Sequence, residues 1–188
     1  MKKLAVFFGI VLFVIGGCRK IKSIGEATIV VHKQYFEPGT DIPFNGERTS
    51  NYITGEIRTK ATYSDGYSEI IVNFYRNQQK RAKLVFADGG RGDMIVHIEW
   101  YKSGQKKYES ADNVIREWYK NGQLKAKANY RNDSGTLHGI TKTWYEDGTL
   151  KGKESYSYGK LDGERVKWDT DGNKILVQVY EEGKLVES

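Results

Sequence analysis

The chain has 188 residues, with 30 lysines and arginines against 24 aspartates and glutamates, a single cysteine, two prolines and 21 glycines. One cysteine excludes an internal disulfide framework and a zinc site built on cysteines. Hydrophobic residues make up only 38% of the chain, which favours a wide, shallow sheet over a deep globular core. The sequence therefore indicates the fold class and the cellular localisation more clearly than the biochemical function.

The N-terminus predicts a secretion signal. Lys2 and Lys3 precede the apolar run Leu4–Ile15, which is too short to cross a bilayer as a helix and has the length of a signal-peptide core. The string Val-Ile-Gly-Gly-Cys that ends at Cys18 resembles a bacterial lipobox, and this resemblance implies cleavage before Cys18 and lipidation of its thiol. The alternatives are an ordinary signal peptide, or a buried apolar segment with an incidental cysteine.

Residues 1–17 are thus predicted to be a lipoprotein signal peptide, and residues 18–26 a lipidated tether. Cleavage removes two lysines and no acid, so 28 basic residues remain against 24 acidic ones and the formal net charge becomes +4. We expect a protein of the bacterial cell envelope, because several acyl chains on one cysteine anchor a protein stably. Arg19 stands where an aspartate favours inner-membrane retention in the lipoproteins that the chain resembles, which points to the outer membrane in a Gram-negative cell.

A repeat occupies most of the remaining chain. Residues 27–43 are expected to form an N-terminal strand and turn, and residues 44–188 a domain of about six repeats. A glycine follows each tryptophan by four residues, as Gly148 follows Trp144, and apolar alternation flanks this turn signal, which indicates a β-hairpin. Both prolines precede residue 44, as expected for a chain whose N–H groups are committed to a sheet. The repeat tryptophans are Trp100, Trp118, Trp144 and Trp168, and the glycines predicted to be left-handed are Gly122, Gly148 and Gly172.

These repeats resemble the bacterial variant of the MORN repeat. The resemblance rests on Phe44–Glu47 with Tyr52–Gly55, and on Trp144–Leu150 with Leu161–Gly163. It implies an all-β fold, an antiparallel array of about six MORN-like hairpins in one long twisted or curled sheet. It also implies membrane association or protein contact, and some bacterial members are called putative antitoxins. Tyr108–Asn113 departs from the pattern, so we expect a bulge or break in the array there.

Strict alternation along the strands predicts two different faces. A three-residue turn pairs Tyr145 with Thr149. Trp144 then lies opposite Leu150 and shares a side with Tyr156. This apolar side is expected to carry also Ile57, Tyr63, Phe74, Leu84, Phe86, Trp100, Trp118, Leu124, Tyr130 and Trp168. The other side is expected to be basic and to carry the candidate binding residues Arg58, Lys60, Arg81, Lys83, Lys125, Lys127, Lys151 and Lys153, with Tyr75, Tyr101, Tyr119 and Tyr145.

Each face has two interpretations. The apolar face is predicted to be the protein's own core, buried as the sheet curls on itself, and the alternative is a platform for glycans or a partner. The basic face is either a binding surface for an anionic partner, such as lipid headgroups, envelope glycans or an acidic protein, or a solvated surface.

The sequence lacks the motifs of serine hydrolases, zinc proteases and P-loop enzymes. His32, His97 and His138 are far apart, and Asp169–Asn173 lacks the glycine spacing and closing glutamate of a calcium loop. We therefore expect no enzyme, cofactor, metal site or small-molecule substrate, and no nucleic-acid partner. The predicted function is a membrane-anchored interaction module for a protein or a membrane surface. The alternatives are a glycan- or cell-wall-binding module that uses the tryptophans and tyrosines, and a toxin-neutralising antitoxin or immunity protein.

Overall fold

The computed structural model describes residues 33–131 and 134–188. The predicted signal peptide (1–17), the tether (18–26) with Cys18, and residues 27–32 lie outside the described residues. Within them, residues 33–45 turn back on themselves through a bridge between Phe36 and Pro43 and lead into the first strand.

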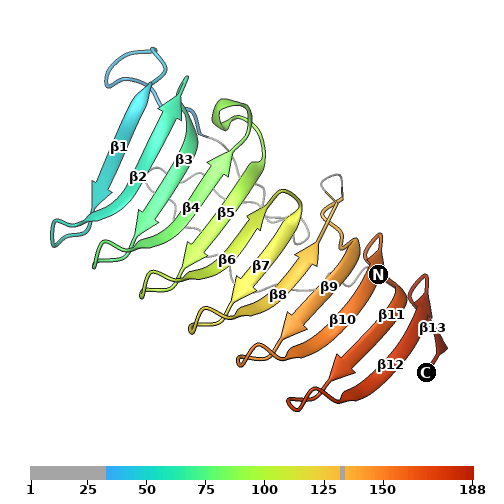
Figure 1. Cartoon of the computed structure of the whole chain (residues 1–188). Helices are drawn as coiled ribbons and strands as arrows, with labels where there is room; N and C mark the ends of the chain where they lie inside the picture. The colour runs from blue at the N-terminus through green and yellow to red at the C-terminus, as the bar shows by residue number, and fades with distance from the viewer. Residues whose placement is uncertain (1–32, 132–133) are drawn as a thin grey trace. The chain divides into compact units, whose positions relative to one another are not determined.

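Thirteen antiparallel strands form one sheet, and each strand pairs with its neighbours in sequence (Figure 1). The strands are β1 (Gly46–Asn51), β2 (Ile57–Ser64), β3 (Tyr67–Phe74), β4 (Lys80–Phe86), β5 (Met94–Trp100), β6 (Lys106–Ala111), β7 (Val114–Trp118), β8 (Leu124–Asn129), β9 (Gly139–Trp144), β10 (Leu150–Ser157), β11 (Lys160–Trp168), β12 (Lys174–Glu181) and β13 (Lys184–Glu187). The described residues add one short 3₁₀ turn, η1 (Asp88–Gly90), and no helix long and apolar enough to cross a membrane. The predicted all-β hairpin array is confirmed.

Six equivalent turns join the strands at one end of the sheet. In the fifth, the Tyr145 N–H donates to the Thr149 carbonyl at 2.9 Å, and the Gly148 N–H donates to the Tyr145 carbonyl at 3.0 Å. Trp144 pairs with Leu150, as the sequence predicts. The three glycines predicted to be left-handed, Gly122, Gly148 and Gly172, have φ of 89°, 94° and 82°, where a side chain with a Cβ is strained. The six repeats and their turns are therefore confirmed.

Shorter turns join several strands at the other end. Asp112 and Asn113, with φ of 51° and 63°, form a two-residue turn of the kind whose twist matches a hairpin. β6 and β7 pair through this turn without a register shift. The break expected in the third repeat is therefore wrong: the shortened segment removes loop residues and leaves the ladder intact.

A β-bulge recurs at the start of the second strand of each hairpin. Trp144 pairs with Leu150, whereas Thr143 pairs with Gly152, so Lys151 is an extra residue in its strand. The equivalent residues of the other hairpins are Arg58, Arg81, Lys107, Lys125 and Ile175. Because side chains alternate with a period of two, one extra residue reverses the faces of everything that follows in that strand.

The bulges overturn part of the predicted face assignment. We call the side of the sheet that carries Trp100, Trp118, Trp144 and Trp168 the tryptophan face, and the opposite side the tyrosine face. Tyr156 pairs with Gly139, in register with Thr141 and Thr143, and so lies on the tyrosine face, away from Trp144. Ile57, Phe74 and Leu124, which precede the bulges, stay on the tryptophan face as predicted, and the residues that follow the bulges, Tyr63, Leu84, Phe86, Tyr130 and Tyr156, do not.

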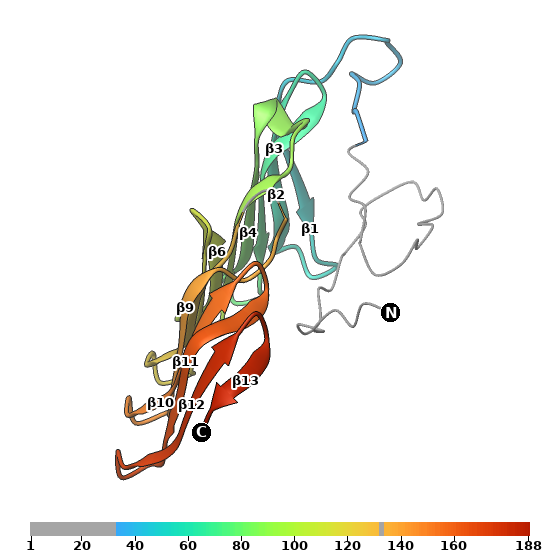
Figure 2. The same cartoon turned by 90° about the vertical axis from the view of Figure 1, so that its right-hand side faces the viewer.

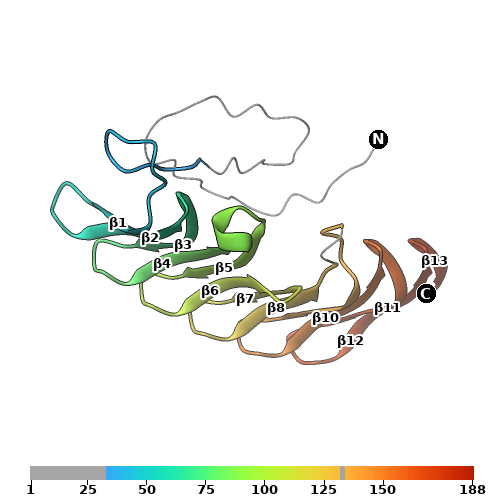
Figure 3. The same ribbon diagram turned by 90° about the horizontal axis from the view of Figure 1, so that it is seen from above.

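The sheet is open. β1 and β13 are its two edges, Figure 2 shows the strands stacked as a single layer, and Figure 3 shows the strands bent along their length. In the described part of the chain, the buried side chains are those of Ala61, Phe86, Val166 and Thr59, and no large side chain is fully buried. The four tryptophans are half-buried. The prediction that the sheet curls to bury them is therefore wrong, because the bulges divide the apolar residues between both faces.

Candidate interaction surface

Tyrosine hydroxyls tie successive hairpins together. Tyr119 begins the fourth turn, and its hydroxyl donates to the backbone carbonyl of Trp144, one hairpin further on, at 2.9 Å. The same bond joins Tyr52 to Phe74 (2.7 Å), Tyr75 to Trp100 (2.9 Å), Tyr101 to Trp118 (2.8 Å) and Tyr145 to Trp168 (2.9 Å). Four of these tyrosines are predicted binding residues. Their hydroxyls act within the array, which leaves the exposed parts of their rings for contact with a partner.

Asp169 replaces the tyrosine in the last of these turns. Its carboxylate accepts the N–H groups of Asp171 at 3.0 Å and Asn173 at 2.8 Å, so it closes its own turn. These bonds hold the pKa of Asp169 below its usual value. In the sixth hairpin a hydrogen bond within the turn thus takes the place of the tyrosine bond to a following hairpin.

The predicted basic ladder does not lie on one face. The second member of each basic pair is on the tryptophan face: Lys153 and Lys127 both pair with Lys142, and Lys60 and Lys83 both pair with Val72. The first members, Arg58, Arg81, Lys125 and Lys151, are the bulged residues. The contacts place two of them on the tyrosine face: the Lys125 ammonium lies 3.2 Å from Glu117, and the Lys151 ammonium lies 5.1 Å from the Tyr145 ring centre. The bulge is again the reason, because it sends the two members of each basic pair to opposite faces.

The tryptophan face combines aromatic rings with lysines. Lys80 and Lys106 lie over the rings of Trp100 and Trp118, at 5.9 and 5.6 Å from the ring centres, close enough for cation–π attraction. Lys153 lies 3.3 Å from Glu164. Sequence reasoning assigned Lys153 to the face opposite the tryptophans, and the bulge at Lys151 moves it to their side; Lys80 and Lys106, which precede the bulges, were assigned to neither face.

A row of lysines crosses three strands of this face. Lys127 in β8 pairs with Lys142 in β9, which pairs with Lys153 in β10. Neither Lys127 nor Lys142 forms a salt bridge within residues 33–131 and 134–188. Like charges directly opposite one another destabilise a sheet by a few tenths of a kcal/mol, roughly. Lys142 was missed in the sequence because it follows the long connection after β8, where the repeat spacing is irregular.

The tyrosine face carries ion pairs in its middle part. Glu99 lies 3.3 Å from His97 and 2.8 Å from Lys107, the bulged lysine of its own hairpin. The hydrogen bond from His97, followed by the bond and charge of Lys107, lowers the pKa of Glu99 to about 2 against the opposing effect of burial. The Glu-Trp-Tyr segments that begin two hairpins are the sequence signal for these pairs.

A second cluster on the tyrosine face surrounds Glu154. Its carboxylate accepts the Tyr156 hydroxyl at 2.7 Å and the Arg165 Nε at 3.0 Å. Burial, followed by this carboxylate, raises the pKa of Tyr156 to about 12. Arg165 also reaches the Tyr180 hydroxyl at 3.5 Å. The charge of Glu154 is therefore compensated from within the sheet.

The geometry of this surface suits binding to a macromolecule. The described residues contain no group of three histidines, cysteines or acids that could hold a metal ion. Two shallow depressions of the described surface lie between neighbouring strands of the tyrosine face. Ammonium groups, hydroxyls and aromatic rings recur along both faces, which suits a broad contact with a macromolecule.

Comparison with known proteins places two hairpins in a family. Residues 111–132, which hold β7 and β8, and residues 137–158, which hold β9 and β10, match the family model described as the MORN repeat variant. No curated protein matches the chain. MORN repeats are generally non-catalytic modules that contact proteins or membranes. The MORN repeat variant signature thus covers the fourth and fifth hairpins, and the same hairpin geometry recurs throughout the sheet.

Proposed function

We propose that the protein is a non-catalytic, membrane-anchored envelope lipoprotein whose hairpin sheet docks onto a protein or membrane surface. The observation that carries this proposal is the open single layer: among the described residues, both faces are accessible and few side chains are buried. An extended sheet with shallow depressions offers a broad contact area, which suits a macromolecule better than a small molecule.

The lysine row of Lys127, Lys142 and Lys153 supports an anionic partner. Its mutual repulsion lowers the stability of the sheet slightly, and an opposite charge on a docking partner removes that cost. The lipobox at Cys18 supplies the anchor, so the sheet is held close to the envelope surface.

The test is crosslinking capture from native membranes with the full chain. Lys127→Glu with Lys142→Glu reverses the charge of the row and should greatly reduce capture of the partner. The matched control is Lys102→Glu with Lys120→Glu, which makes the same charge change at two exposed turn residues. Equal capture by both double variants would show that the row does not contact the partner. If the wild-type chain captures no partner and binds no membrane, the proposed function itself is wrong.

The identity of the captured molecule separates the alternatives. A toxin captured specifically would support a toxin-neutralising protein, and isolated envelope glycans bound without any protein would support a glycan-binding module. Neither outcome is expected if the sheet docks onto a resident envelope protein or onto the bilayer.

A further inference from the structure

The tyrosine face changes its charge along the array. In the third, fourth and fifth hairpins, the residue just before the tryptophan pairs with the residue just after the bulge. These pairs are Glu99 with Tyr108, Glu117 with Ala126, and Thr143 with Gly152. In the third and fourth hairpins this residue is a glutamate, and it pairs with the bulged lysine: Glu99 with Lys107 at 2.8 Å and Glu117 with Lys125 at 3.2 Å.

The fifth hairpin keeps the lysine and lacks the carboxylate. Thr143 stands where Glu99 and Glu117 stand, and Lys151 is the bulged lysine. In the next strand the equivalent residue is Lys167, which pairs across Gly152. Neither Lys151 nor Lys167 forms a salt bridge within the described residues. Two ammonium groups therefore lie where the preceding hairpins hold neutral pairs.

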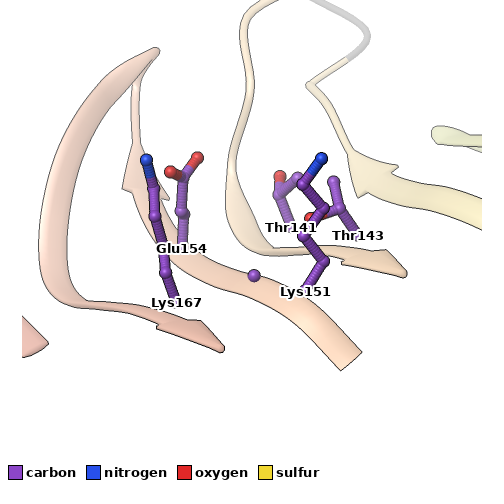
Figure 4. A pocket seen from close by; sticks show the side chains of 6 residues that line it. Thr141, Thr143, Lys151, Glu154 and Lys167 are labelled. Carbon is purple, nitrogen blue, oxygen red and sulfur yellow. The ribbon is translucent and has the colours of Figure 1, made fainter. Parts of the chain in front are cut away.

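These groups border one of the depressions of the tyrosine face. It has a volume of about 140 Å³ and is lined by Thr141, Thr143, Lys151, Gly152, Glu154 and Lys167. Figure 4 shows the labelled side chains extending to the same side of the strands. Gly152 leaves space at the bottom of the depression. A Cβ at this position would fill that space and come within 2.9 Å of the Thr143 Oγ1. The fourth hairpin has Ala126 at this point of the register.

Glu154 does not neutralise this site. Its carboxylate is taken up by Arg165 at 3.0 Å and by the Tyr156 hydroxyl at 2.7 Å. Glu154 and Arg165 therefore form a neutral pair. The positive charges of Lys151 and Lys167 remain at the depression, and the hydroxyls of Thr141 and Thr143 are further hydrogen-bond donors there.

We infer that this depression binds the carboxylate of an aspartate or glutamate side chain from a docking protein. The array itself indicates the ligand, because the chain's own glutamates occupy the matching place beside Lys107 and Lys125. A partner carboxylate would complete in the fifth hairpin the ion pair that the third and fourth hairpins make internally. This inference rests on the proposed function and adds, on the tyrosine face of the fifth hairpin, a second point of contact for a protein partner beside the lysine row of the tryptophan face.

The test uses the full chain in detergent and a fluorescein-labelled octaglutamate peptide, with binding followed by anisotropy. Thr143→Glu installs the internal carboxylate of the neighbouring hairpins and should weaken peptide binding about tenfold, while Lys151→Gln should weaken it about threefold. Two controls should change binding by less than about twofold. They are Ser103→Glu, which adds the same charge at an exposed turn, and Lys125→Gln, which removes a lysine already paired with Glu117.

Several outcomes overturn the inference. Equal weakening by Thr143→Glu and Ser103→Glu would mean that the peptide senses only net charge. Vesicles of phosphatidylglycerol form a second arm: if vesicle binding falls in Thr143→Glu while peptide binding does not, the site takes lipid phosphate. Circular dichroism checks that each variant keeps its sheet. If the wild-type chain still captures its partner while Thr143→Glu alters neither capture nor peptide binding, the site is wrong and the proposed function stands.

Discussion

The tyrosine ties between hairpins predict a measurable loss of stability when one hydroxyl is removed. Tyr119→Phe keeps the ring and deletes the hydrogen bond to the Trp144 carbonyl, which is 2.9 Å long and partly buried. A typical protein hydrogen bond contributes about 1 kcal/mol, and a half-buried carbonyl left without its donor raises the loss toward about 2 kcal/mol. For a chain of this size, that loss lowers the melting temperature by about 2 to 4 °C per kcal/mol.

The assay is urea and thermal unfolding followed by circular dichroism. The control is Tyr158→Phe, because Tyr158 is 64% exposed and the contact of its hydroxyl is a 3.4 Å approach from Arg131. The control should differ from wild type by less than about 0.5 kcal/mol. Because hairpins of a repeat array contact mainly their neighbours, Tyr75→Phe and Tyr145→Phe should also have additive effects when combined. If Tyr119→Phe is as stable as Tyr158→Phe, the ties do not stabilise the array and the account of the repeated tyrosine is wrong.

Three further predictions concern a turn, an ion pair and the anchor. Gly148→Val should destabilise the sheet by about 1 to 2 kcal/mol in urea unfolding, because φ is 94° there, whereas Lys142→Val at an exposed strand position should be nearly neutral. Glu99→Gln should cost on the order of 1 to 2 kcal/mol at pH 7; because the folded pKa of about 2 lies below the ordinary 4.5, this difference should be full above pH 4.5 and vanish as the pH falls toward 2. A difference independent of pH would contradict the hydrogen bond from His97 and the ion pair with Lys107. Cys18→Ser should abolish incorporation of a fatty-acid analogue during growth, and equal labelling of the variant would refute the predicted lipobox.

The positions of the hairpins follow from the sequence because their signals are local. A glycine in a tight turn is needed for a positive φ, so Gly122, Gly148 and Gly172 mark turns wherever the rest of the chain lies. The pairing of Trp144 with Leu150 follows from the length of that turn. A regular series of such units is enough to predict one antiparallel sheet in sequence order.

The faces of the sheet were decided by tertiary structure. Strict alternation predicts that Lys151 and Lys153 share a side, but a bulge at Lys151 sends them to opposite sides, and the same bulge moves Tyr156 away from Trp144. A bulge is a property of two paired strands, since it appears when one strand has one residue more than its partner between two fixed pairs. No single strand therefore displays it.

The tyrosine hydrogen bonds between hairpins and the candidate carboxylate site were also decided by tertiary structure. Tyr119 meets the Trp144 carbonyl only after both hairpins have formed, and Lys151 and Lys167 come together only when β10 and β11 pair, which sets Gly152 opposite Lys167. The sequence alone determined the repeat, its turns and the expected lipid anchor, because these depend on neighbouring residues. The tertiary structure decided which charges share a face and that the sheet stays open, because both depend on the register between paired strands.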